Sequence, residues 1–225
     1  MTLRFVSAFV PRTGSTDGWS WKATTDGNFT TKSAYELLEA TREEQQVQPL
    51  EMAKVWEAPT SHKAKVTAWR CLRNRLATCD NLRRRNIQIS WEERWCNACV
   101  AGKETTEHLI LHCPKASVVW DQIFQWLHIK TANPRGILQH FTSFISAAKI
   151  KKGRRLLIAL WVGIVWMLWE NRNESRFQGK VWDIDRCVLQ IKGRLWSWNE
   201  AYKILELGIP FTLWCSKGFN LSFLF

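Results

Sequence analysis

The spacing of cysteines and histidines in the middle of the chain constrains its fold more than any other feature. Residues 96–113 read CNACVAGKETTEHLILHC and hold three of the seven cysteines and two of the five histidines of this 225-residue chain. The spacing is Cys96-x2-Cys99-x8-His108-x4-Cys113. Structural zinc takes four Cys or His ligands at the corners of a tetrahedron, and a Cys-x2-Cys turn presents two thiolates from one tight loop. The spacing therefore predicts one structural Zn²⁺ around which this region folds.

Two side chains compete for the fourth position of the predicted zinc site. His112 lies four residues after His108, on the same face of a helix, and would complete a Cys2His2 set. Cys113 would complete a Cys3His set, and a thiolate is the better structural ligand. We favour Cys96, Cys99, His108 and Cys113, and His112 stays open as the alternative. Four protein ligands leave no open position, so we expect a structural site and not a catalytic one.

A redox motif and ordinary burial are the competing explanations of the Cys-x2-Cys pair. A thioredoxin-like pair follows a strand and opens a helix, whereas WEERW precedes this pair and a loop containing Gly102 follows it. Ordinary burial does not explain a histidine at this distance. The odd cysteine count, and an apolar run at residues 5–10 that is shorter than a secretory signal, indicate a reducing interior and not secretion. Clustered cysteines in that environment bind metals or catalyse.

Positive charge is concentrated just before the cysteine cluster. The net charge is +12, and residues 63–85 hold eight Lys or Arg against one acid, a net +7. Such a run is either a solvated helix face or a surface that displaces counterions from nucleic-acid phosphates. The residues that we predict to contact nucleic acid are Lys63, Lys65, Arg70, Arg73, Arg75, Arg83, Arg84 and Arg85. Trp91 and Trp95 are candidate platforms for base stacking beside the cluster.

The sequence pattern predicts a mainly α-helical chain with a small N-terminal β-hairpin and a central zinc knuckle of the Cys-Cys-His-Cys type. The hairpin is expected from the alternation of Trp19, Trp21 and Ala23, a turn at Asp26-Gly27 and a second strand at residues 29–31. Three regions are expected: residues 1–50 with the hairpin, a helix and a linker, residues 51–130 with basic helices and the knuckle, and residues 131–225 with further helices.

Two long helices are predicted in the last of these regions. Residues 156–169 are fourteen consecutive uncharged residues. Crossing a bilayer takes about 20, so we expect a buried core helix and no membrane span. Apolar residues then repeat by four and three from Ile184 to Leu205, which is a heptad seam. We expect this seam to pack antiparallel on the first helix, and a protein partner bound through it is the alternative. An apolar tail follows.

Several motifs in this chain occur together in one known family. They are GNFTTKSAY at residues 27–35, VWEAPTSHKAKVTAWRCLRNRLATCDNLRRRNI at 55–87, and the Cys-x2-Cys, ETTEHLILHC and VW series to Trp120. Together they resemble the zinc-binding domain found C-terminal to the reverse transcriptase of plant LINE-type (non-LTR) retrotransposons. Where that family usually has Leu-Pro-Thr, this chain has Leu76-Ala77-Thr78. The resemblance implies the ligand set Cys96, Cys99, His108 and Cys113, and a nucleic-acid-associated module of a retroelement polyprotein.

No catalytic motif accompanies these features. The chain has no Asp-Asp pair for the two-metal site of a polymerase, no phosphate-binding P-loop and no Gly-x-Ser-x-Gly elbow. The acids Glu92, Glu93, Glu104 and Glu107 have no evident partner and are expected at the surface. We therefore predict a non-enzymatic module that binds one Zn²⁺ and RNA or DNA, takes no small-molecule substrate, and resides in the nucleus or otherwise the cytoplasm. The alternatives are a helical protein-interaction module and an inert retroelement fragment.

Overall fold

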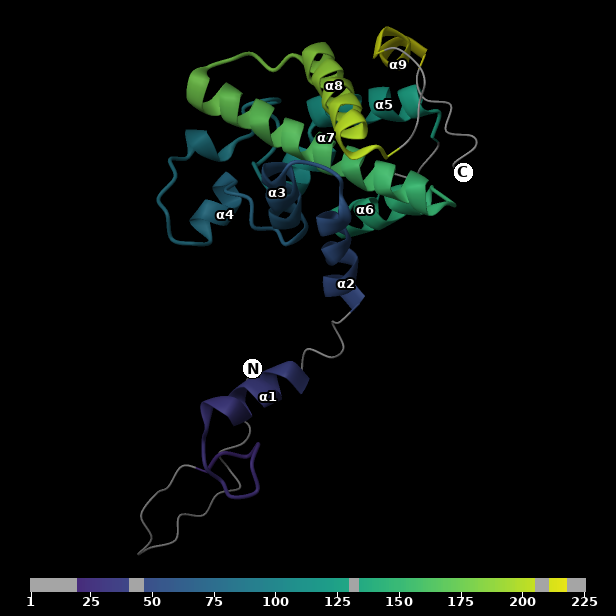
Figure 1. Cartoon of the computed structure of the whole chain (residues 1–225). Coiled ribbons are helices and arrows are strands. Elements are labelled where there is room, and N and C mark those ends of the chain that lie inside the picture. The colour runs from purple at the N-terminus through teal and green to yellow at the C-terminus, as the bar shows by residue number, and fades with distance from the viewer. Residues whose placement is uncertain (1–19, 41–46, 130–133, 205–210, 218–225) are drawn as a thin grey trace, which may run out of the picture. The chain divides into compact units, whose positions relative to one another are not determined.

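The chain is mainly α-helical and divides into two compact units. The computed structural model describes residues 20–40, 47–129, 134–204 and 211–217 (Figure 1). The units comprise residues 1–47 and 48–225. Over the described ranges no β-strand is present, and one isolated bridge joins Trp95 to Lys103.

The N-terminal β-hairpin predicted from the sequence is wrong for the residues that the structure describes. Residues 20–30 form a series of turns, in which the amide of Trp21 donates to the carbonyl of Gly27 over 2.7 Å. The Asp26 carboxylate accepts a hydrogen bond from the amide of Asn28 (3.1 Å). The bond to the Asp26 side chain competes with pairing between strands, so the segment closes on itself and forms no ladder. Trp19 lies outside the described residues.

Helices follow one another along the rest of the chain. Helix α1 (Thr31–Ala40) completes the described part of the N-terminal unit. The elements after it are α2 (Val47–Ala53), η3 (Lys54–Glu57), α3 (His62–Leu72), α4 (Cys79–Arg83), η4 (Glu92–Arg94), η5 (His108–His112), α5 (Pro114–Leu127), α6 (Ile137–Ser146), α7 (Lys151–Gln178), α8 (Ile184–Tyr202) and α9 (Phe211–Lys217).

Helix α7 is the centre of the larger unit. All of its residues from 156 to 168 are buried, because α3, α6, α8 and η5 contact it from several sides (Figure 1). A helix that is apolar on nearly every side needs such a set of partners to stay out of water. This confirms the core helix predicted at residues 156–169. Among the described helices, none combines the length and the apolar character needed to span a membrane.

The heptad seam on α8 packs inside the chain. Its residues Val188, Ile191, Leu195 and Trp198 are buried, and α8 contacts both α7 and α5. Close approach to α7 depends on Gly163, since a Cβ there would lie 3.0 Å from the Trp198 ring. A protein partner bound through this seam would have to displace α7. Leu205, the last residue of the predicted seam, lies outside the described residues.

Helix α9, the described part of the predicted apolar tail, packs on this core; the rest of the tail lies outside the described residues. Trp214 is fully buried, and its carbonyl accepts a hydrogen bond from Nε1 of Trp126 over 3.0 Å. The indole of Trp214 donates to the carbonyl of Lys192 (3.2 Å). These two bonds connect α9 to α5 and α8.

The basic segment lies on α3 and α4, and both helices begin at a hydroxyl cap. The Ser61 hydroxyl accepts from the amide of Ala64, and the Thr78 hydroxyl accepts from the amide of Asn81, each over 3.4 Å. Capping satisfies backbone donors that the first turn of a helix leaves free. Helix α3 contacts α7, and small residues such as Ala64 and Ala68 are buried on it, whereas the basic side chains of Lys63 and Arg70 are exposed.

Candidate metal centre

Four side chains that the spacing singled out come together in the structure. One possible ligand atom from each of Cys96, Cys99, His108 and Cys113 lies within 4.8 Å of all the others. Sγ of Cys96 is 3.9 Å from Sγ of Cys113, and Sγ of Cys99 is 3.2 Å from Nε2 of His108. In a tetrahedral site with Zn–S bonds of about 2.3 Å, two sulfurs lie about 3.8 Å apart. Three thiols and one imidazole at these separations fit a structural Zn²⁺.

The two thiols of the Cys-x2-Cys pair are presented by one tight loop. The amide of Val100 donates to the carbonyl of Cys96, and the amide of Cys96 donates to the carbonyl of Gly102, both over 2.8 Å. Val100 adopts the left-handed conformation with φ 58°, which reverses the chain directly after Cys99. This backbone arrangement brings Cys96 and Cys99 to the same side of the loop.

Gly102 lies directly against the imidazole of the cluster. A Cβ at this position would be 2.4 Å from Cε1 and 2.7 Å from Nδ1 of His108. Any side chain would therefore push the ring out of its position. The sequence alone predicts a loop at this glycine, whereas the steric requirement depends on where the fold places His108.

Helix η5 determines which side chain joins the cluster as the fourth member. It is a π-helical turn, in which the amide of Cys113 donates to the carbonyl of His108, five residues earlier, over 2.6 Å. The wider turn places Cys113, and not His112, beside His108. His112 is exposed, and its Nε2 donates to the carbonyl of Arg135 over 3.0 Å.

The structure corrects the prediction of a central zinc knuckle of the Cys-Cys-His-Cys type, because the four side chains come together without forming a separate knuckle. The residues Leu109, Ile110 and Leu111 of η5 are fully buried, and η5 contacts α5 and α7. The carbonyl of Ile110 also accepts a hydrogen bond from Nε1 of Trp120 over 2.8 Å. The turn between His108 and Cys113 is thus part of the main core, and the cluster is embedded in the helical fold.

The two most buried thiols of the cluster differ in acidity. The hydrogen bond with Cys113, followed by burial, raises the pKa of Cys96 to about 12. The same bond lowers the pKa of Cys113, against the effect of burial. Cys113 therefore ionises more readily than Cys96. A bound Zn²⁺ would displace the protons of both, because zinc binds thiolates.

Glu104, which we expected at the surface, is buried beside the cluster. Its Oε1 accepts from the amide of Cys79, and its Oε2 accepts from Nε of Arg172, both over 3.1 Å. Nη1 of Arg176 lies 3.6 Å from the same Oε2. The carboxylate therefore connects the loop after Gly102 to α4 and α7. Sequence spacing gave no signal for this contact, because Glu104 and Arg172 are 68 residues apart.

Five of the eight basic residues predicted to bind nucleic acid form one surface. Two hollows of about 240 and 270 Å³ share Arg75 and Arg85 as lining residues. We call the five residues around them the arginine surface, which consists of Arg70, Arg73, Arg75, Arg84 and Arg85. Within the described part of the chain, no carboxylate lines either hollow. Asp80, which lies outside them, pairs with Arg84 at 2.9 Å and offsets one of the five positive charges. The other four arginines keep the surface positive.

The other three predicted residues lie apart from this surface. Lys65 donates from Nζ to the carbonyl of Trp56 over 3.1 Å, which connects it to η3. Lys63 is exposed and lines neither of the two hollows. Arg83 lines a different hollow, together with Trp91 and Trp95.

A partly buried polar network connects the arginine surface to the cluster. Nδ2 of Asn81 donates to Oδ1 of Asn74 over 3.0 Å, and the Thr106 hydroxyl donates to the same oxygen over 2.7 Å. Asn74 has φ 49° and lies between two arginines of the surface. Thr106 precedes His108 by two residues. The loop that carries these arginines is therefore held by the segment that carries the histidine of the cluster.

One known protein family matches the part of the chain that holds both the cysteine–histidine cluster and the arginine surface. Residues 29–120 match the family whose model is described as zinc-binding in reverse transcriptase. The resemblance predicted from the motifs is confirmed. The matched residues include the four side chains of the cluster and the whole arginine surface. The matched family describes a zinc-binding domain of reverse transcriptase and not its catalytic domain.

The chain also has a relative in Arabidopsis thaliana. A protein named as a ribonuclease H protein is 28% identical over 115 residues, which is 49% of this chain. The chain spans 17% of the length of that relative. No solved structure matches the chain.

Proposed function

We propose that this chain is a non-enzymatic, zinc-stabilised module of retroelement origin that binds RNA or DNA through backbone phosphates. Cys96, Cys99, His108 and Cys113 would hold one structural Zn²⁺. The arginine surface would contact phosphates, with Lys63 and Arg83 as outlying contributors. The observation that carries the proposal is the arginine surface itself, with five guanidinium groups around two hollows that no described carboxylate lines.

Arginine suits phosphate because its planar guanidinium offers several donors in a fixed fork. Each phosphate that is neutralised on a duplex releases counterions, which makes the slope of log K against log salt more negative by about 0.9. Five contacts would therefore give a slope of about −4 to −5. This dependence distinguishes phosphate binding from the alternative of a helical protein-interaction module, since an apolar interface responds little to salt.

The zinc ion would act on binding indirectly. Structural zinc contributes about 10–16 kcal/mol to the folding of isolated zinc-finger peptides. Here the segment of the cluster also holds Asn74 through Thr106. Loss of zinc would loosen that segment, and with it the loop between Arg73 and Arg75. We expect chelation to weaken nucleic-acid binding although no arginine is removed.

The test compares three versions of the full, zinc-loaded chain on labelled oligonucleotides by fluorescence anisotropy, from about 50 to 200 mM salt. The first is the wild type. The second carries Arg73→Gln, Arg75→Gln and Arg85→Gln. The third carries Lys151→Gln, Lys152→Gln and Arg155→Gln, a matched control that removes the same charge from the exposed start of α7.

We expect the second version to bind more weakly. Its slope of log K against log salt should be less negative by about 2 to 3, because each lost phosphate contact reduces the slope by about one. The α7 control should stay close to the wild type. Equal losses in both triple variants would show that net charge alone attracts the polyanion, and would contradict the arginine surface. A chain that binds no nucleic acid would favour an inert fragment. Nuclear residence, the location that suits this role, is tested by imaging the tagged full chain in plant cells.

A further inference from the structure

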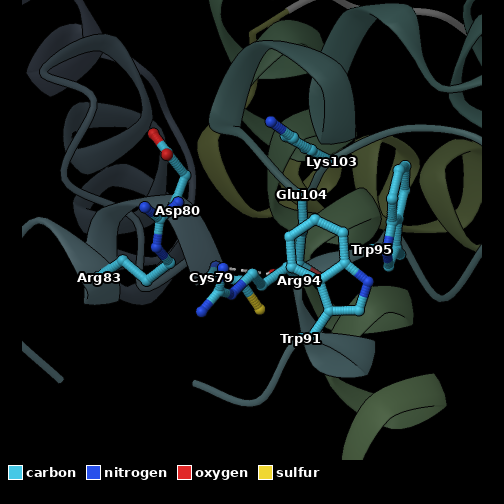
Figure 2. A pocket seen from close by; sticks show the side chains of 8 residues that line it. All are labelled: Cys79, Asp80, Arg83, Trp91, Arg94, Trp95, Lys103 and Glu104. Carbon is cyan, nitrogen blue, oxygen red and sulfur yellow. Dashed lines mark hydrogen bonds between the residues drawn. The ribbon is translucent and has the colours of Figure 1, made fainter. Parts of the chain in front are cut away.

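A third hollow lies between α4 and the segment that leads into the cysteine cluster. Its volume is about 220 Å³. Figure 2 shows two indole rings, those of Trp91 and Trp95, beside each other in this hollow. The polar residues around it are Cys79, Asp80, Arg83, Arg94, Lys103 and Glu104. The hollow therefore combines an aromatic wall with a charged rim, unlike the two hollows of the arginine surface.

Trp91 is the part of the aromatic wall that is open to solvent. Its side chain is 60% exposed although an indole is large and apolar. The guanidinium of Arg94 lies over the ring at 5.3 Å from its centroid, and Trp95 meets it nearly edge-on at 6.3 Å. Arg94 and Trp95 hold the ring in place and leave more than half of the residue's surface open to solvent. An exposed aromatic ring held in this way stacks on a planar ligand at little cost in conformational entropy.

The charges around the hollow favour an anionic ligand. Its two acids are already neutralised, since Asp80 pairs with Arg84 at 2.9 Å and Glu104 pairs with Arg172 in the core. Arg83 and Lys103 have no carboxylate partner among the described residues. Figure 2 shows these two side chains on different sides of the hollow. A ligand that places a flat ring on Trp91 and negative groups at both sides would satisfy both features.

We propose that this hollow binds an unstacked base of single-stranded RNA or DNA. Trp91 stacks on the base, and Arg83 and Lys103 contact the phosphates on either side of it. A base inside a duplex is already stacked on both faces, so only single-stranded nucleic acid offers such a base without unpairing. Arg83 is followed directly by Arg84 and Arg85 of the arginine surface, so a strand that leaves the hollow continues onto that surface. The inference rests on the function proposed above and narrows its ligand to a single strand.

The test uses the zinc-loaded full chain and three probes of equal length: a single strand of uniform base, the same sugar–phosphate backbone without bases, and a duplex. Trp91→Ala removes the proposed stacking platform. Trp56→Ala is the matched control, because Trp56 is another exposed tryptophan (41%), on η3 and outside this hollow. Trp91→Tyr restores an aromatic ring.

We expect the wild type to bind the single strand about 5- to 150-fold more tightly than the base-free backbone, as one stacked base provides. Trp91→Ala should remove most of this preference and leave the affinities for the base-free backbone and the duplex unchanged. Trp56→Ala should keep the preference, and Trp91→Tyr should restore much of it.

Equal wild-type affinities for the strand with and without bases would overturn the inference and leave the proposed phosphate binding intact. The same holds if Trp91→Ala retains the preference, or if Trp56→Ala loses it to the same extent. Failure of the wild type to bind any of the three probes would overturn the proposed function together with this inference. The two failures are thereby distinguishable.

Discussion

Glu104 and Arg172 form a buried ion pair between the loop of the cysteine cluster and the central helix. Their side chains are 0% and 4% exposed, and Nε of Arg172 donates to Oε2 of Glu104 over 3.1 Å. Glu104 follows Gly102 by two residues, so the pair fixes the loop at the point where it leaves the cluster. The position of the candidate metal site therefore depends on α7 as well as on its own short segment.

Breaking this pair should destabilise the fold strongly. Glu104→Gln leaves the Arg172 guanidinium buried without its counter-charge, and the free energy of unfolding should fall by about 3–5 kcal/mol. Urea unfolding of the zinc-loaded chain measures the change. Glu107→Gln is the control, because Glu107 is an exposed acid three residues later and should change stability by less than about 0.5 kcal/mol. Similar effects of the two substitutions would refute the structural role of the pair.

Zinc content should depend on Cys113 and not on His112. The structure places Cys113 in the cluster and pairs the His112 ring with the carbonyl of Arg135. We expect about one zinc per wild-type chain by native mass spectrometry, retention of zinc by His112→Ala, and its loss by Cys113→Ser, since a structural site needs its four ligands. The reverse pattern would establish the Cys2His2 set. A chain without zinc that keeps its fold after chelation would refute the metal site altogether.

Gly102→Ala should weaken the metal site without removing a ligand. The new Cβ would lie 2.4 Å from Cε1 of His108, so the ring must move. Changes around the ligands of a metal site typically cost about 10- to 100-fold in affinity, and competition with a chromophoric zinc chelator measures this. At Gly136 the nearest atom to an added Cβ is 3.5 Å away, in Gln139. Gly136→Ala should therefore leave zinc affinity unchanged, and a similar loss there would exclude the steric explanation.

Acid should destabilise the fold through His140. This ring is buried, and its Nδ1 accepts a hydrogen bond from Nε1 of Trp161 over 3.1 Å. Burial, with a smaller contribution from His112, lowers the pKa of His140 from 6.5 to about 4. The unfolded chain therefore takes up this proton at a higher pH than the folded chain. The free energy of unfolding should decrease by about 3 kcal/mol in total as the pH falls from about 6.5 to 4.

Zinc release in acid has to be separated from this effect, because protonation of the cluster also weakens metal binding. His140→Gln removes the titrating ring and leaves the four cluster residues in place. Urea unfolding at a series of pH values should show the variant less stable than the wild type near neutral pH, with the difference shrinking towards pH 4. A difference that stays constant with pH would contradict the assignment to His140.

Features that depend on neighbours in the chain were predictable from the sequence. The candidate ligands fall within 18 residues, and the Thr78 cap acts on an amide three positions away. An unbroken uncharged run predicts the core helix at residues 156–169. In each case the relevant interaction is encoded by spacing along one segment.

Features that depend on distant segments were not predictable. The partner of Glu104 lies on a helix 68 residues later, so the acid looked unpaired in the sequence. Alternating residues at 19–23 suggested a strand, but a hairpin also needs backbone pairing, and turns closed by Asp26 compete with it. The hollow at Trp91 forms only because α4 packs beside the loop that leads into the cluster.

The π-helical winding of residues 108–112 makes the choice of the fourth donor a property of the backbone. In this winding the side chain five positions after His108 faces the ring, and that side chain is a thiol. In a turn of α-helical pitch, the side chain four positions after His108 would face the ring instead, and that side chain is the imidazole of His112. The pitch of this one turn, which the buried side chains of Leu109, Ile110 and Leu111 hold in the core, therefore selects a sulfur-rich set of donors over a nitrogen-rich one.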